Sequence, residues 1–143
     1  MVERRVYIDK NLVEFVKILS DPESEKRIFN SMAQCMAFAA TYGFKNNKRK
    51  KIERASTKAV DPIHYQYFES AHVESLFVLF ALASEKDYKK ALSDSEESRE
   101  LRIATFEEYA KGGMLDGRKF EIVKEYDRVE DYGKYKGKKV KYV

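Results

Sequence analysis

The stretch ESEKRIFNSMAQCMAFAATYGF, residues 23–44, predicts one long helix in the hydrophobic core. Its centre is strongly apolar, as expected of a helix that is buried among other elements. The apolar residues of this stretch are Ile28, Phe29, Met32, Ala33, Met36, Ala37, Phe38 and Ala40. We therefore expect a central helix from about Glu23 to Tyr42.

Residues on both sides of this stretch are typical of helix ends. Ser20 or Asp21 can cap the start, and Pro22 suits the first turn. Gly43 can supply a left-handed residue at the end, with Phe44 folding back on the last turn. The sequence thus predicts a sharp boundary at each end of the central helix.

A short strand and a first helix are predicted before the central helix. Residues 4–9, RRVYID, alternate between apolar and polar side chains with the period of two that is typical of a strand. Val6 and Ile8 would face inward, whereas Arg5, Tyr7 and Asp9 would face outward. Between Asn11 and Leu19 the apolar residues recur at helical spacing, after a capping aspartate, at Leu12, Phe15, Val16 and Leu19.

Further helices are predicted after the central one. Residues 45–58, which contain NNKRKK, lack periodicity and are read as an exposed basic loop. Pro62 opens an apolar segment whose residues cover several helix faces, at Ile63, Tyr67, Phe68, Val73, Leu76, Phe77, Phe80 and Ala81. Another helix should run through residues 101–110 and stop at Gly112-Gly113. Phe120, Ile122 and Val123 support one more short helix.

These patterns predict a mainly α protein, a compact helical domain over residues 1–132 with a short N-terminal strand. Residues 133–143 form a lysine-rich tail that is either a short C-terminal strand or a basic arm. The longest apolar run, Leu76–Ala83, is far shorter than the roughly 20 residues that cross a bilayer. Because the start also lacks the apolar region of a signal peptide, we expect a cytoplasmic protein.

Positive charge is concentrated at the two ends of the sequence. Residues 1–60 contain 13 Lys and Arg against 7 Asp and Glu, whereas residues 61–132 contain 10 against 17. Five further lysines lie in residues 133–143. This asymmetry fits a surface for nucleic acid or for an acidic partner, and it equally fits charge complementarity within the chain or between subunits.

The basic residues of the N-terminal third are the candidate site. Lysines and arginines neutralise DNA phosphates, and the run after the central helix would do so with help from the strand. The candidate DNA-binding residues are Arg4, Arg5, Tyr7, Lys45, Lys48, Arg49, Lys50 and Lys51. Lys10 would extend this surface if the strand lies near the loop. A solvated loop without a partner remains an equal alternative, because short basic runs are common.

Residues that carry catalysis or bind metals form no recognisable pattern. His64 and His72 are eight residues apart, too far on one helix to share a metal unaided, and are read as surface or half-buried histidines. Cys35 is the single cysteine and lies in an apolar run, so we expect a buried structural thiol. Neither GxxxxGK[ST] nor GxGxxG occurs. We expect no catalytic residue, no cofactor and no metal.

The order strand, helix, helix across residues 4–42 resembles the ribbon-helix-helix unit of DNA-binding repressors. In that unit two chains pair their strands and insert the ribbon into the major groove. The resemblance implies that Arg5, Tyr7 and Asp9 face DNA, and it leaves a homodimer open.

Two blocks carry a more specific resemblance, FNSMAQCMAFAATYGFKNNKRKKI at residues 29–52 and LRIATFEEYAKGGMLDG at residues 101–117. With the RRVYIDK start, they resemble the small accessory proteins of dnd systems, which place phosphorothioate sulfur in DNA and restrict unmodified DNA. The chain departs from the pattern at Lys111, where asparagine is expected, and in a tail after Tyr126. The resemblance implies a restriction-modification or antiviral defence context with DNA nearby, and no catalytic residue.

Two functions follow as hypotheses. The first is an accessory DNA-binding or DNA-complex subunit of a phosphorothioation-type system, which works beside other subunits of that system. The alternative is a non-catalytic protein-interaction adaptor whose acidic middle and basic ends engage partner proteins.

Overall fold

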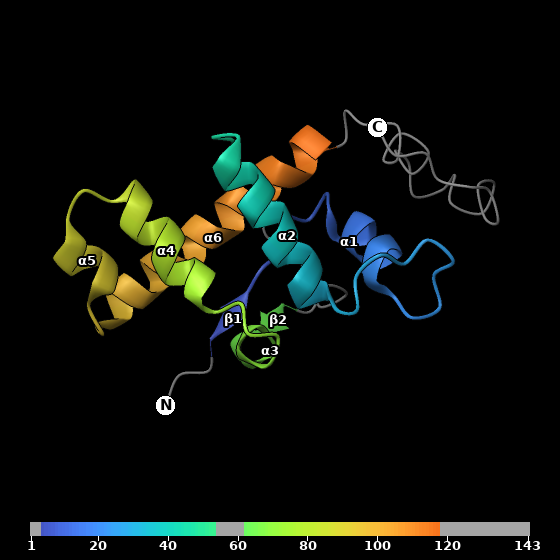
Figure 1. The fold of residues 1–143 in the computed structure, drawn as a ribbon, viewed down its shortest axis with the longest axis horizontal. Helices are drawn as coiled ribbons and strands as arrows, with labels where there is room; N and C mark the ends of the chain where they lie inside the picture. Colours follow the sequence, from blue (N-terminus) through green and yellow to red (C-terminus); the bar gives the residue numbers. More distant parts are fainter. Residues whose placement is uncertain (1–3, 54–61, 118–143) are drawn as a thin grey trace.

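Helices dominate the computed structural model, which describes residues 4–53 and 62–117 (Figure 1). The elements are β1 (Arg5–Val6), α1 (Val13–Ser20), α2 (Met32–Lys45), β2 (Ile63–His64), α3 (Tyr65–Ser70), α4 (Ser75–Ser84), α5 (Tyr88–Leu92) and α6 (Glu96–Gly117). The predicted mainly α fold is confirmed. The predictions for Phe120, Ile122 and Val123 and for residues 133–143 lie outside the described residues. No helix within 4–53 or 62–117 is both long and apolar enough to cross a membrane.

Helices α2 and α6 form the centre of the molecule and cross each other closely (Figure 1). A Cβ atom on Gly113 would overlap the Ala39 carbonyl, and one on Gly43 would overlap the Tyr109 carbonyl. The two backbones therefore approach each other where only glycine fits. This corrects two predictions, because Gly43 lies inside α2 and Gly112-Gly113 does not stop α6. Glycine costs a helix about 1 kcal/mol relative to alanine, and the close packing offsets this cost.

Helix α2 is shorter than predicted and begins at Met32 instead of Glu23. The Ser31 hydroxyl accepts a hydrogen bond from the Gln34 N–H at 3.2 Å and caps the helix. The preceding residues form turns tied to α1, since the N–H groups of Ile28 and Phe29 both donate to the Leu19 carbonyl. The motif Ser31-x-x-Gln34 is a capping signal, and it sets the start of α2 in place of the predicted start near Pro22.

The N-terminal strand exists but is short and pairs within the chain. β1 and β2 are antiparallel, with Arg5 opposite His64 and Val6 opposite Ile63. Val6 and Ile8 are buried, as predicted. Asp9 is also buried, so the outward position predicted for it is wrong. β1 therefore has a strand partner other than a second copy of itself.

An aromatic cluster fills the space between α3, α4 and α6. Phe77 stacks on Phe106 with ring centroids 4.1 Å apart, and Phe68 meets both rings edge to face. Phe44, at the end of α2, stacks on Phe80 instead of folding back on its own helix. Three residues predicted to be buried are exposed: Ile28 in the turn before α2, Phe38 on α2 and Tyr67 on α3.

Candidate nucleic-acid interface

The basic run follows α2 directly and turns back towards α6. Asn47 adopts a left-handed conformation with φ of 54°, which asparagine tolerates better than most residues. The Lys48 N–H then donates to the Gly43 carbonyl at 2.7 Å, and the Lys50 N–H donates to the Glu108 carbonyl of α6 at 3.1 Å. We call residues 46–53 the basic loop. Its backbone is fixed to both central helices.

Gly112 allows the backbone of the basic loop to pack directly against α6. A Cβ atom there would overlap the Lys48 carbonyl and would lie 2.9 Å from the Arg49 nitrogen. One helical turn before Gly112, Glu108 accepts a hydrogen bond from the Arg49 Nε at 2.7 Å, and the same guanidinium lies over the Tyr109 ring. The loop is thus held by contacts along the C-terminal half of α6. The exposure predicted for residues 45–58 is confirmed for residues 46–53 except the half-buried Ile52, whereas Lys45 belongs to α2 and residues 54–58 lie outside the described residues.

Asp9 and Lys111 join the loop to the N-terminal segment. The Lys111 Nζ lies 2.9 Å from Asp9 Oδ1 and donates to the Lys51 carbonyl at 2.8 Å. Asp9 also accepts from the N–H groups of Glu53 at 2.7 Å and Asn11 at 3.1 Å. Burial raises the pKa of Asp9, but these hydrogen bonds and the charge of Lys111 outweigh that effect and lower the pKa below its ordinary value. Asp9 is therefore a structural anion and not a group that faces DNA.

The predicted basic residues differ in how much of their charge is offset. Arg49 is paired with Glu108, and the Lys48 Nζ lies 4.0 Å from Asp116 Oδ1. In the part of the chain that the structure describes, the side chains of Lys45, Lys50 and Lys51 form no ion pair within 4.0 Å. All three residues are exposed. They supply the positive charge of this face.

The predicted strand residues lie further along α6 from the loop. Arg4 pairs with Glu96 at 3.6 Å, near the start of α6, and the Tyr7 backbone N–H donates to Glu107 at 2.6 Å. Since a helix rises about 1.5 Å per residue, Glu96 and Glu108 are about 18 Å apart. The structure therefore brings Lys45, Lys48, Arg49, Lys50 and Lys51 together and places Arg4 apart from them. Arg5 is exposed and Tyr7 half-buried on the intervening segment.

Lys10 and Lys111 complete the surroundings of the loop. The Lys10 Nζ lies 3.1 Å from Glu53 Oε2, and the backbone N–H of Lys10 donates to the Glu53 carbonyl at 2.7 Å. Lys10 was predicted to extend the surface if the strand lay near the loop. Lys10 itself reaches the loop, whereas Arg4 lies near the start of α6. Lys111 was missed as a contact residue, because a lone lysine in a helix gives no sign that it will meet an anion a hundred residues earlier.

Cys35 and the two histidines do not belong to the basic loop. Cys35 is 2% exposed on α2, and burial raises the pKa of its thiol to about 12. The predicted buried thiol is confirmed. His64 is half-buried and His72 exposed. Within residues 4–53 and 62–117, no three His, Cys, Asp or Glu residues lie close enough to hold a metal ion.

Comparison with known families shows to which family this chain belongs. A family described as DNA sulphur modification system-associated protein 4 matches residues 5–127, most of the sequence. The chain belongs to this family. The match spans both resemblance blocks and ends one residue after Tyr126, so the lysine-rich end lies beyond the dnd-associated family region. Neither a curated protein nor a solved structure shows significant similarity to the chain.

Family membership supports an accessory role in a DNA sulphur modification system. The ribbon-helix-helix resemblance does not extend to the structure, because β1 pairs with β2 and α2 starts late. In this member of the dnd-associated family, the RRVYIDK start lies along α6 and contacts it through Arg4, Tyr7 and Asp9.

Proposed function

We propose that this protein is a non-catalytic accessory subunit that contacts the DNA backbone in the cytoplasm, through the face formed by Lys45 and the basic loop. One observation carries the proposal: Lys45 at the end of α2 and Lys50 and Lys51 on the basic loop are exposed and have no ion-pair partner among the described residues, and the loop backbone is fixed to α2 and α6. Lysines held in place lose less conformational freedom on binding phosphates than lysines on a free loop. Membership of a family associated with DNA sulphur modification supports this proposal.

The expected contact is with phosphates and not with base edges. Lysine ammonium groups position a protein on the duplex but do not read its sequence. The charge of Arg49 and Lys48 is partly offset by Glu108 and Asp116. We therefore expect modest affinity that depends strongly on salt, with the specificity of the system residing in other subunits.

A salt series of duplex binding tests this proposal. The slope of log affinity against log salt should fall by up to about 0.9 for each phosphate contact removed. The triple variant Lys45→Ala, Lys50→Ala, Lys51→Ala should weaken binding to unrelated sequences alike and flatten this slope. Lys86→Ala, Lys89→Ala, Lys90→Ala removes the same charge from exposed positions near α5 and is the matched control. Equal slopes for the two variants, or no wild-type binding at low salt, would refute the DNA contact.

Exposed apolar side chains favour the adaptor role as the second candidate. Leu79 on α4 is 52% exposed, and Tyr88 and Leu92 on α5 are 66% and 54% exposed. Large apolar groups that gather at a surface mark interaction sites. If DNA binding is absent, the double variant Leu79→Ser, Leu92→Ser should reduce co-purification with other subunits of the modification system, whereas the loop variant should not.

A further inference from the structure

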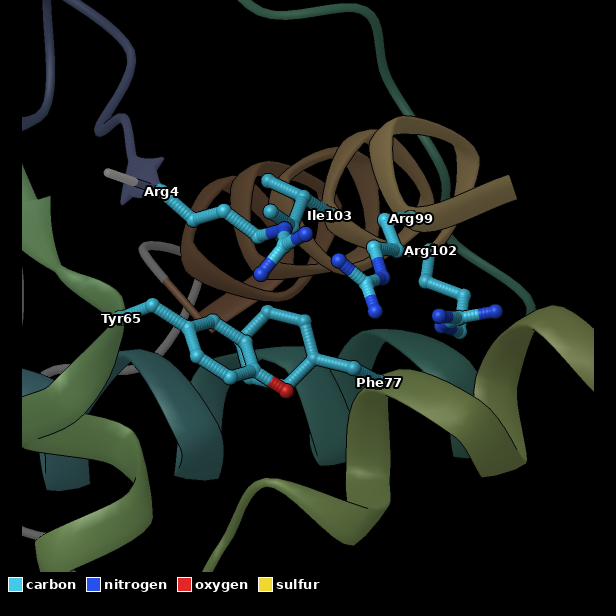
Figure 2. A pocket seen from close by; sticks show the side chains of 6 residues that line it. All are labelled: Arg4, Tyr65, Phe77, Arg99, Arg102 and Ile103. Atoms are coloured by element: carbon cyan, nitrogen blue, oxygen red, sulfur yellow. The ribbon is translucent and has the colours of Figure 1, made fainter. Parts of the chain in front are cut away.

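A cavity of about 130 Å³ lies beside the first half of α6, well away from the basic loop. Its lining contains three arginines and no carboxylate, and consists of Arg4, Tyr65, Phe77, Arg99, Arg102 and Ile103. Figure 2 shows Arg4 entering from the strand side and the other two arginines from α6, with the rings of Tyr65 and Phe77 along the opposite side. Arg99, Arg102 and Ile103 share one face of α6 because they are three and four residues apart.

The three guanidinium groups are held in place by groups that leave much of their charge available. Arg102 donates through one nitrogen to the carbonyls of Ala91 at 2.8 Å and Ser93 at 2.9 Å, which fixes it without neutralising it. Arg99 pairs with Asp94 at 2.9 Å, and the Asp94 side chain is 93% exposed. Exposed ion pairs of this kind contribute little and exchange readily with another anion.

Arg4 has hydrogen-bonding capacity left over inside the molecule. Its Nε is buried without a hydrogen-bond partner among the described residues. Its terminal nitrogen lies 3.6 Å from Glu96, whose side chain is 51% exposed. A buried donor without a partner is destabilising, so an acceptor in the cavity would be stabilising.

The carboxylate of Asp94 is affected by the charges of all three arginines. The hydrogen bond from Arg99 and its charge lower the pKa of Asp94. Burial raises this pKa, and the charges of Arg102 and Arg4 lower it by smaller amounts. The charges of all three arginines therefore favour the ionised form of the same carboxylate.

We propose that Arg4, Arg99 and Arg102 form a binding site for a phosphate monoester. Arginine matches phosphate oxygens with pairs of N–H groups, and a monoester carries about −1.5 to −2 charge at pH 7 with three acceptor oxygens. A phosphodiester inside a strand offers a single charge and lacks the terminal group with three acceptor oxygens. The cavity is far below the roughly 300–1,000 Å³ of pockets that enclose a drug-sized ligand, so it accepts the phosphate and leaves the rest of the ligand outside.

The test uses the full chain and defined phosphate probes. Calorimetric titration would compare inorganic phosphate, adenosine 5′-monophosphate, and one short single-stranded DNA with and without a 5′-phosphate. Arg99→Gln and Arg4→Gln should each weaken binding of the monoester about tenfold or more, as expected for a lost charge-assisted hydrogen bond. Lys90→Gln, which removes a charge of α5 outside the cavity lining, is the control. A preference for the 5′-phosphorylated strand over adenosine 5′-monophosphate identifies a strand end as the source, and the reverse identifies a free nucleotide.

A second readout needs no variant. In the wild-type protein, phosphate should shift the side-chain Nε–Hε nuclear magnetic resonances of Arg4, Arg99 and Arg102 together. Unchanged resonances at saturating phosphate, or monoester affinity that Arg99→Gln and Arg4→Gln leave intact, would overturn the assignment. This site does not depend on the basic loop: the Lys45, Lys50, Lys51 variant should retain phosphate binding, so the two proposals fail separately.

Discussion

Asp9 is the residue at which three separate segments meet. It is 1% exposed and accepts hydrogen bonds from the N-terminal segment, from the end of the basic loop and from Lys111 on α6. Carboxylates with several donors are stabilised in their charged form. Lys111 supplies the one full positive charge of this set. Asp9 therefore links the loop to the fold through a charge that the sequence pattern had placed on the surface.

The stability of the fold should depend on the ionisation of Asp9. We expect Asp9→Asn to lower the free energy of unfolding near pH 7 by about 2 kcal/mol, since hydrogen bonds to charged groups contribute roughly 1.5–3 kcal/mol. The pKa of Asp9 is lower in the folded than in the unfolded chain. The carboxylate therefore stabilises the fold above its ordinary pKa of 3.8, and this contribution disappears as the pH falls through the lower folded-state value.

Urea denaturation of both proteins from pH 7 to pH 2.5 would measure this dependence. The difference between wild type and Asp9→Asn should shrink below about pH 4. Glu25→Gln, at an exposed carboxylate in the turn before α2, should give no such difference at any pH. A difference for Asp9→Asn that stays constant with pH would mean that the charge of Asp9 does not stabilise the fold.

Cys35 should react slowly with thiol reagents in the folded protein. Burial raises its pKa to about 12, so the reactive thiolate is about one part in ten thousand at pH 8. Labelling should become fast in denaturant, and Cys35→Ser should lower the free energy of unfolding by about 1–3 kcal/mol through a poorly satisfied buried hydroxyl. Rapid labelling of the folded chain would instead indicate a functional thiol.

At the scale of elements, the glycines of α2 and α6 decide how the central helices pack. Sequence reasoning assigned Gly43 and Gly112-Gly113 to helix ends, because glycine usually interrupts a helix. The structure uses them for contact between backbones instead. This role of the glycines depends on the contact between α2 and α6, and the residues next to each glycine in the sequence do not indicate which helices will be in contact. The same limitation explains Lys111, whereas the amphipathic stripe of α1 and the buried Val6 and Ile8 follow from local periodicity and were predicted.

Gly113→Ala should destabilise the protein even though alanine is the better helix former. The new methyl group would overlap the Ala39 carbonyl, and overpacking of this kind costs about 1–3 kcal/mol. Thermal unfolding followed by circular dichroism would show a lower Tm. Glu100→Ala, an exposed position of the same helix, should change the free energy of unfolding by less than about 0.5 kcal/mol. A Tm for Gly113→Ala at or above that of wild type would show that the two helices can separate without cost.

At the scale of the whole molecule, α6 organises the positive charge into two places. The basic loop lies on its C-terminal half, and the arginine cavity lies beside its N-terminal half. The sequence predicted the first place, because lysines gather in one run. It could not predict the second, since Arg4 and the pair Arg99 and Arg102 are far apart in the sequence and meet only when β1 packs along α6. The two places differ in shape, one an exposed loop and the other a cavity, and this difference underlies the two separate proposals.

The route of the N-terminal segment along α6 also constrains how the chain folds during synthesis. Tyr7 and Glu107, which share a hydrogen bond, are 100 residues apart. The basic loop and the apolar surface of α2 therefore find their main partner only after α6 has left the ribosome. Contacts between such distant residues close slowly, and an unpartnered α2 exposes aggregation-prone surface in the meantime. We expect the nascent N-terminal half to require binding by a chaperone until α6 has been synthesised.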